Sequence, residues 1–337
     1  METRIQSTIP AVPFFAMPDE QPNLFGTTTA QVRNLPFIEA NTHEVDMRHL
    51  REDCIIPVFS KDNEVTISHQ DFIETVFDAA YSVFPTERLS EPSIRVSHIV
   101  KGRIPEAIHK PVSELLESDK TIYHERMMFC IEVPSIHRDI DGCRLNLTIG
   151  GVRAYNEQNL YSRKSPEKFR IFIGFKNMVC CNLCVSTDGY KASVKVLDTH
   201  ALLEAAVQLF RSYDMNTHLR LMQAYGECSL TESQFAQLLG KCRMYQYLPT
   251  SQKKRLPEML MTDTQVNIVA RSYYEDPDFG RTSGSDIPLW KVYNLLTGAN
   301  KASYIDNFLD RAENASTLTT GICRALYGDP QYAWFIR

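Results

Sequence analysis

The chain has 337 residues, of which 43% are hydrophobic and 23% are charged, and its formal net charge is −5. These values exclude a collagen-like, disordered or coiled-coil protein. The negative net charge also excludes a simple polycation that coats nucleic acid. At roughly 100–200 residues per domain, the length predicts two domains, or one domain with an elaboration.

Residues 1–40 are predicted to form an irregular, proline-rich arm. Its prolines forbid a continuous helix or a central strand, and they are Pro10, Pro13, Pro18, Pro22 and Pro36. The arm also carries apolar side chains such as Phe14 and Phe25, so packing on a surface or partner and disorder both stay open. The N-terminus lacks a secretory signal and no apolar run approaches ~18 residues. We therefore expect a cytoplasmic protein with no membrane partner.

Residues 41–197 are predicted to form a β-rich α+β domain. Residues 54–84 have the pattern strand, turn, strand and helix, with Ser68 as the helix N-cap and Asp71 completing a capping box. Alternating or β-branched runs then predict strands at 93–100, 126–133, 144–152, 169–175, 178–186 and 192–196. The predicted loop 137–142 ends in Asp-Gly, which is typical of a hairpin turn. Successive strands joined by turns predict an antiparallel sheet.

Residues 198–337 are predicted to form a helical C-terminal domain or subdomain. Capping boxes at Ser229–Glu232 and Thr262–Gln265 predict two helix starts, and Pro288 is expected to be the first residue of a third helix. One more helix, or a broken pair, is expected over residues 303–326. The predicted fold class is therefore α+β, with an antiparallel sheet in the N-terminal and middle part followed by helices.

The charge is unevenly distributed along the chain. Residues 1–93 have a net charge of −9, residues 94–195 of +5 and residues 196–337 of −1. Aromatic residues interleave with the basic middle, and this combination suits single-stranded nucleic acid, because cations hold phosphate and rings stack on bases. The candidate nucleic-acid-binding residues are Arg95, Lys101, Arg103, Arg153, Arg163, Lys164, Lys168, Arg170 and Lys176. A solvated lysine face over a phenylalanine core is the alternative, and the alternation in residues 169–175 favours it for the rings.

No catalytic residue, metal site or cofactor site is predicted. The sequence lacks the signatures of phosphate-binding loops, dinucleotide-binding folds, zinc proteases and serine hydrolases. Cys180, Cys181 and Cys184 include one CxxC spacing, but no second pair completes a zinc site. Buried core cysteines are therefore favoured over metal or redox chemistry.

The histidines give no stronger signal. His137, Asp139 and Asp141 could bind a metal, but a solvated turn is the favoured interpretation. His98 and His124 lie in strand-like runs, and no Ser, Cys or Asp partner can be defined for either of them from the sequence. A structural role is therefore favoured over catalysis for both.

Four stretches of the chain form a recognisable set, namely Arg95–Pro105, Tyr123–Glu132, Leu145–Asn156 and Ile173–Cys184. Together they resemble a bacterial family of unknown function, numbered 3871 among the domains of unknown function, over nearly all of the chain after the arm. Val179–Asn182 and Leu289–Leu296 also resemble, more weakly, a larger phage- and plasmid-borne family numbered 932. The resemblance implies a gene of a conjugative element or prophage. It brings no assigned catalytic residues.

Three functions stay open at this point. The favoured one is a non-enzymatic accessory of DNA metabolism in a mobile element or prophage, which binds single-stranded nucleic acid through the basic middle. The alternative is a protein that binds and inhibits a host defence enzyme, with the acidic residues 1–93 presenting a phosphate-like surface. The third is an enzyme whose active site matches no recognisable motif.

Overall fold

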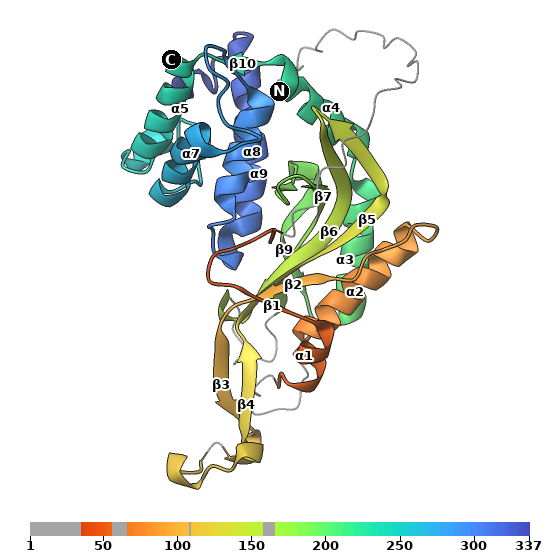
Figure 1. The fold of residues 1–337 in the computed structure, drawn as a ribbon. Coiled ribbons are helices and arrows are strands. Elements are labelled where there is room, and N and C mark those ends of the chain that lie inside the picture. The colour runs from red at the N-terminus through yellow and green to blue at the C-terminus, as the bar shows by residue number, and fades with distance from the viewer. Residues whose placement is uncertain (1–34, 56–65, 108, 158–165) are drawn as a thin grey trace, which may run out of the picture. The chain divides into compact units, whose positions relative to one another are not determined.

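The computed structural model describes residues 35–55, 66–107, 109–157 and 166–337. A curled antiparallel sheet lies between helices in this part of the chain (Figure 1). Its strands are β1 (His43–Val45), β2 (Ser93–Val96), β5 (Arg126–Ile140), β6 (Cys143–Ala154), β7 (Glu167–Asn177), β8 (Leu183–Cys184) and β9 (Tyr190–Val196). The strands pair in the order β1-β2-β5-β6-β7-β8, and β9 also pairs with β7. The predicted α+β fold with an antiparallel sheet is confirmed.

The hairpin between β5 and β6 is tighter than predicted. Asp141 and Gly142 form its turn at φ angles of 48° and 74°, which a two-residue turn of this kind requires at both positions. The predicted loop 137–142 is wrong in its length, because β5 continues to Ile140 and pairs with β6 beyond a register shift between Val133 and His137. His137 therefore lies on an exposed stretch of strand.

Consecutive residues of the central strands point to opposite faces of the sheet, and both faces are buried. Phe129 and Ile131 of β5 belong to one apolar cluster with Phe72 of α2 (His69–Val83), and α3 (Thr199–Ser212) adds to the same cluster. Met128 belongs to a second cluster with Phe308 of α9 (Ile305–Leu326). Helices α2 and α3 thus cover one face, and the first half of α9 covers the other. With both faces buried, these strands show little apolar–polar alternation.

The C-terminal part is helical, as predicted. Besides α3 and α9 it contains α4 (Met215–Glu227), α5 (Glu232–Tyr245), α6 (Thr250–Lys253), α7 (Asp263–Glu275) and α8 (Leu289–Asn300). The strands β10 (Ser229–Leu230) and β11 (Ile287–Pro288) pair with each other and bracket α5–α7.

The predicted helix starts are correct in part. The capping box at Thr262–Gln265 is confirmed, whereas Pro288 is the N-cap of α8 and not its first residue. The predicted box at Ser229–Glu232 is wrong: Thr231 caps α5 with Gln234 as its partner, because Ser229 is held in β10.

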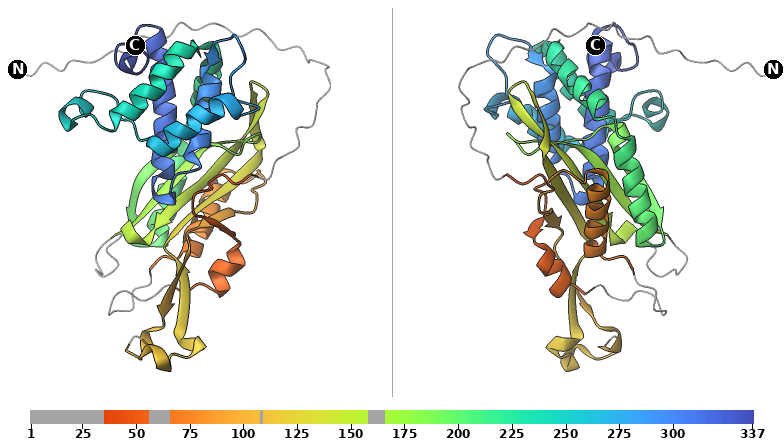
Figure 2. Two further views of the ribbon diagram at one scale, coloured as in Figure 1. Left: turned by 60° about the vertical axis from the view of Figure 1, so that its left-hand side comes forward. Right: turned by 90° about the vertical axis from the view of Figure 1, so that its right-hand side faces the viewer.

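A second hairpin projects away from the main sheet (Figures 1 and 2). It consists of β3 (Ile99–Arg103) and β4 (Lys120–His124), so the predicted strand 93–100 is two strands in two sheets. Helix α1 (Met47–Glu52) lies near its base (Figure 1). The strand predictions between residues 54 and 67 fall mainly on residues 56–65, outside the described residues.

The sheet and the C-terminal helices share one hydrophobic core. The described residues fall in one compact unit, and a single cluster joins Ile149 of β6 to Leu289 and Trp290 of α8. The strands of the main sheet give way to helices between Val196 and Thr199. Among the described residues, no helix has the length and apolarity needed to cross a membrane.

Candidate functional site

Those predicted basic residues that the structure describes do not all lie on one surface. Arg163 and Lys164 lie outside the described residues. Lys101 is exposed on β3, and Arg103 on the same strand donates a 2.6 Å hydrogen bond to the carbonyl of Lys110. Arg95 on β2 is mostly buried and hydrogen-bonds Thr42 at the edge of β1, at 3.1 Å. Arg95 thus belongs to the main sheet, whereas Lys101 and Arg103 belong to the separate β3–β4 hairpin.

Arg153 is a buried structural cation. Its guanidinium lies between the rings of Tyr155 and Phe169, 4.6 and 4.5 Å from their centroids, and its side chain is fully buried. It donates hydrogen bonds to the Glu167 carboxylate and to the Ile67 carbonyl. Burial raises the pKa of Glu167, although the nearby Arg153 partly offsets that rise. The buried Arg153 guanidinium is therefore not accessible to a phosphate in this structure, and the burial does not favour its predicted place in a nucleic-acid interface.

Three further predicted cations lie on the opposite face of the sheet from Arg153, and each has a carboxylate partner. Glu157 accepts from Lys168 at 2.8 Å and from Arg170 at 2.9 Å. Burial opposes ionisation of Glu157, but these two hydrogen bonds outweigh it and lower its pKa. Lys176 pairs with Glu132 at 2.8 Å. The structure brings Lys168 and Arg170 together, but their charges are neutralised locally.

A different basic surface lies on the C-terminal helices, and we call it the α5–α6 surface. Its cations are Lys241, Arg243, Lys253, Lys254 and Arg255, and its partly or fully exposed rings are Tyr247 and Trp334. Lys241 stacks over Trp334 at 4.7 Å, and Trp334 contacts the Tyr245 ring at 6.5 Å. Lys253 lies 5.6 Å from the same Tyr245 ring. These contacts place cations of α5 and α6 on adjoining parts of one surface.

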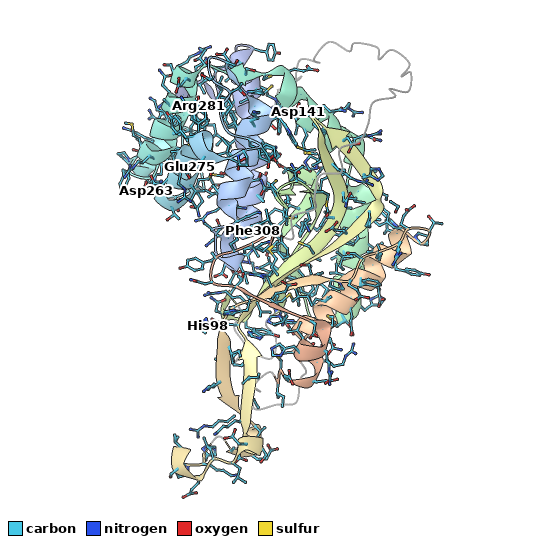
Figure 3. The ribbon with its side chains drawn as sticks, in the orientation of Figure 1. His98, Asp141, Asp263, Glu275, Arg281 and Phe308 are labelled. Atoms are coloured by element: carbon cyan, nitrogen blue, oxygen red, sulfur yellow. The ribbon has the colours of Figure 1, made fainter. Side chains whose placement is uncertain are left out.

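The α5–α6 surface differs from the middle of the chain in its ion pairing. Arg243 faces Asp263 at 3.4 Å, and Figure 3 labels Asp263 at this end of the molecule. Lys241, Lys253, Lys254 and Arg255 have no ion pair within the ranges that the structure describes. The signal is present in the sequence, because residues 233–257 contain five Lys and Arg and no Asp or Glu. It was missed because residues 196–337 are nearly neutral as a whole.

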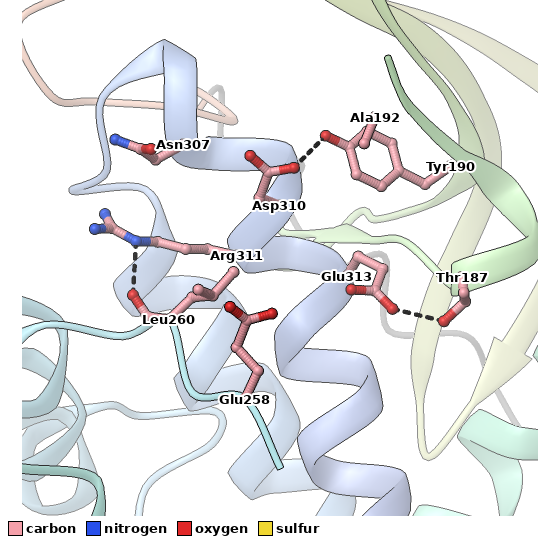
Figure 4. Close-up of a pocket in the computed structure, with 9 residues that line it drawn as sticks. All are labelled: Thr187, Tyr190, Ala192, Glu258, Leu260, Asn307, Asp310, Arg311 and Glu313. Atoms are coloured by element: carbon pink, nitrogen blue, oxygen red, sulfur yellow. Dashed lines mark hydrogen bonds between the residues drawn. The ribbon is translucent and has the colours of Figure 1, made fainter. Parts of the chain in front are cut away.

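A pocket of about 530 Å³ lies between α9 and β9 (Figure 4). Three carboxylates line it, from Glu258, Asp310 and Glu313. Tyr190 donates a 2.6 Å hydrogen bond to Asp310, and burial together with this bond raises the pKa of Tyr190 far above its usual value. Arg311 is turned toward the Leu260 carbonyl at 3.0 Å. A lining of this charge repels phosphate, so the pocket does not suit nucleic acid.

Cys180 and Cys181 lie in the turn after β7, and Cys184 lies in β8. Cys181 and Cys184 are buried, and burial raises the pKa of the Cys184 thiol to about 12, so the thiol stays protonated at neutral pH. The neighbouring Asn182 donates to the Asn294 carbonyl at 3.0 Å, and Asn177 donates to the Asn294 side chain at 2.9 Å. These two hydrogen bonds therefore hold α8 against the end of β7 and the turn that follows it.

Comparisons with known proteins identify the family of the chain but give no activity for it. The family model described as "Domain of unknown function, B. Theta Gene description (DUF3871)" matches residues 19–336. The chain belongs to this family. No curated protein and no solved structure matches the chain. The membership confirms the resemblance carried by the four sequence stretches, and the weaker resemblance to the family numbered 932 stays a prediction.

Proposed function

We propose that this DUF3871 protein binds single-stranded nucleic acid through the α5–α6 surface, as a non-enzymatic accessory in the DNA metabolism of a mobile element or prophage. The observation that supports the proposal is a set of four cations that have no carboxylate partner in the described part of the chain, namely Lys241, Lys253, Lys254 and Arg255. An unpaired cation can neutralise a phosphate and release its counterion. A cation already held by a carboxylate, such as Lys168 by Glu157, has to give up that partner first.

The rings on this surface supply the second component of single-strand binding. The Tyr247 ring is 74% exposed just after the end of α5. The apolar side chain of Met244, in the last turn of α5, is 57% exposed beside it in the sequence. Bases stack on exposed aromatic rings at about 1–3 kcal/mol each, with little dependence on sequence. A strand that places its phosphates along α6 can therefore stack a base on Tyr247. Binding with little sequence preference follows from this arrangement.

The test is fluorescence anisotropy with a labelled single-stranded oligonucleotide and the full chain. A triple variant, Lys253→Ala with Lys254→Ala and Arg255→Ala, removes three cations from α6 and the residues after it. In 0.1 M salt each phosphate contact with a single strand is worth about fivefold in affinity, so the triple variant should bind on the order of 100-fold more weakly.

The matched control removes the same charge elsewhere. Arg138, Lys195 and Arg211 are exposed cations on β5, β9 and α3, and replacing all three with alanine changes the net charge equally. The proposal expects this control to bind within about threefold of the wild type, since only long-range field is lost. An equal loss in both triple variants, or no binding by the wild type at low salt, would contradict the proposal.

A further inference from the structure

Three side chains with metal-binding atoms meet where α1 approaches the base of the β3–β4 hairpin. His49 lies on α1, Cys54 follows that helix, and His124 is the last residue of β4. The His49 Nε2 and His124 Nε2 atoms are 3.0 Å apart, and Cys54 Sγ is 3.6 Å from His49 Nε2. All three donor atoms lie within 4.8 Å of one another.

The second nitrogen of each histidine is already occupied. His49 Nδ1 lies 2.8 Å from the Asp53 carboxylate, and His124 Nδ1 lies 2.7 Å from the carbonyl oxygen of Ser97. Both partners are acceptors, so each Nδ1 carries a hydrogen and donates it. This arrangement, in which a carboxylate or carbonyl holds the Nδ1–H, orients metal-binding histidines in proteins and makes Nε2 the ligand atom.

The consequence is that two Nε2 lone pairs face each other at 3.0 Å. Two neutral acceptors repel at this distance unless a cation lies between them. Either a proton on one ring or a metal ion bound by both rings removes the repulsion. The thiol at 3.6 Å from one of the two nitrogens favours the metal ion, because a shared proton requires no third ligand.

Two of the three ligand separations are close to those around a tetrahedral ion. With Zn–N distances of about 2.0–2.1 Å and a Zn–S distance of about 2.3 Å, two nitrogen ligands lie about 3.3 Å apart and a nitrogen and a sulfur about 3.6 Å apart. The corresponding separations here are 3.0 and 3.6 Å. Two imidazoles and one thiolate also match the ligand preference of zinc, and they exclude magnesium and calcium, which take oxygen ligands.

Backbone contacts hold Cys54 and His124 in place without a metal ion. Cys54 forms a parallel β-bridge with Ile122, and the Ile55 N–H donates to the Ile122 carbonyl at 2.9 Å. His124 is 2% exposed, and its carbonyl accepts a 2.8 Å hydrogen bond from His69 of α2. The ligands therefore come from a preorganised frame, although they are up to 75 residues apart in the sequence.

We propose that His49, Cys54 and His124 form a binding site for a divalent transition-metal ion, with Zn²⁺ as the best fit. Three protein ligands leave the fourth tetrahedral position to water or to an exogenous ligand, which is the arrangement of an open site. Asp53 is a positioning residue that orients His49. The ion links α1 to the projecting β3–β4 hairpin. The proposal is independent of nucleic-acid binding by the α5–α6 surface.

The experiment uses the full chain after chelator treatment and dialysis. Titration with Co²⁺ is followed by its absorption, and Zn²⁺ is then added in competition. We expect one equivalent of Co²⁺ to bind with d–d bands of a tetrahedral ion and a thiolate-to-metal charge-transfer band, and Zn²⁺ to displace it. An absence of stoichiometric binding, with the chain folded by circular dichroism, would overturn the proposal and leave a shared proton between the two imidazoles.

Variants assign the ligands. Cys54→Ser should abolish the charge-transfer band, and His124→Asn should weaken metal binding by at least 100-fold. Cys323→Ser and His200→Asn are the matched controls, since Cys323 is half-buried and His200 is exposed, both on other helices. Asp53→Asn, at an exposed position, should keep the fold and weaken binding by about 10–100-fold. Equal metal affinity in the ligand variants and the controls would overturn the assignment.

Discussion

The buried Arg153–Glu167 ion pair gives a prediction whose size follows from the structure. Replacing Arg153 with methionine keeps most of the apolar contact with the rings of Tyr155 and Phe169 and removes the charge. The Glu167 side chain is only 15% exposed, so its carboxylate is left largely without water or a cation. The Ile67 carbonyl also loses its donor. We expect Arg153→Met to reduce the free energy of unfolding by about 3–5 kcal/mol.

A double variant separates the ion pair from the packing around it. Adding Glu167→Gln to Arg153→Met removes the remaining buried charge, so the double variant should be more stable than Arg153→Met by about 1–3 kcal/mol. Urea unfolding followed by circular dichroism measures both differences. A loss below 1 kcal/mol in the single variant, or a double variant no more stable than the single, would refute the reasoning. The folded Arg153→Met protein should bind oligonucleotide as the wild type does.

Two other predictions concern stability. Burial lowers the pKa of His218 to about 4, so the ring stays neutral in the folded state at neutral pH. Below pH 6.5 the unfolded chain takes up a proton at this histidine and the folded chain does not, so the free energy of unfolding falls as the pH falls toward 4. Between pH 7 and pH 4 the wild type should lose about 3 kcal/mol more than His218→Gln in denaturant unfolding, and equal losses would contradict this. An alanine Cβ at Gly151 would lie 2.5 Å from the Phe72 ring, so Gly151→Ala should destabilise the fold by about 1–3 kcal/mol. An alanine Cβ at Gly226 in α4 would meet no heavy atom within 4 Å, so Gly226→Ala should stabilise the fold by about 0.5–1 kcal/mol. If the Tm changed in the same direction in both glycine variants, the result would count against close packing of α2 on β6.

Local patterns predicted the elements whose geometry is set within a few residues. The Asp141-Gly142 turn and the capping boxes at Ser68 and Thr262 were found because each depends on neighbours two or three positions away. The box at Ser229 was misplaced by two residues, because pairing of β10 with β11, some 57 residues further along the chain, decided where α5 begins. The strand predicted at 178–186 is confirmed only over β8 (Leu183–Cys184), since Cys181 before it has a φ of 59° and Asn182 is held by α8.

The candidate sites were harder to predict, because both depend on partners that are distant in sequence. Counting charge along the chain could not show that Glu132 of β5 neutralises Lys176 of β7, with β6 between them. The metal-ligand set has no motif spacing, since His49 and His124 meet only when α1 lies beside the β3–β4 hairpin. For this reason His124 was interpreted as a lone structural histidine. The α5–α6 surface is the exception, because its five cations fall within 25 residues that carry no acid.

The most direct test of the proposed function is the salt dependence of oligonucleotide binding. For a single strand, the logarithm of the binding constant falls with the logarithm of the salt concentration by about 0.7 for each phosphate contact. The triple variant at Lys253, Lys254 and Arg255 should therefore give a slope shallower than that of the wild type by about 2. The control triple variant at Arg138, Lys195 and Arg211 should keep the wild-type slope. If the triple variant at Lys253, Lys254 and Arg255 also kept the wild-type slope, the α5–α6 surface would not be the nucleic-acid interface.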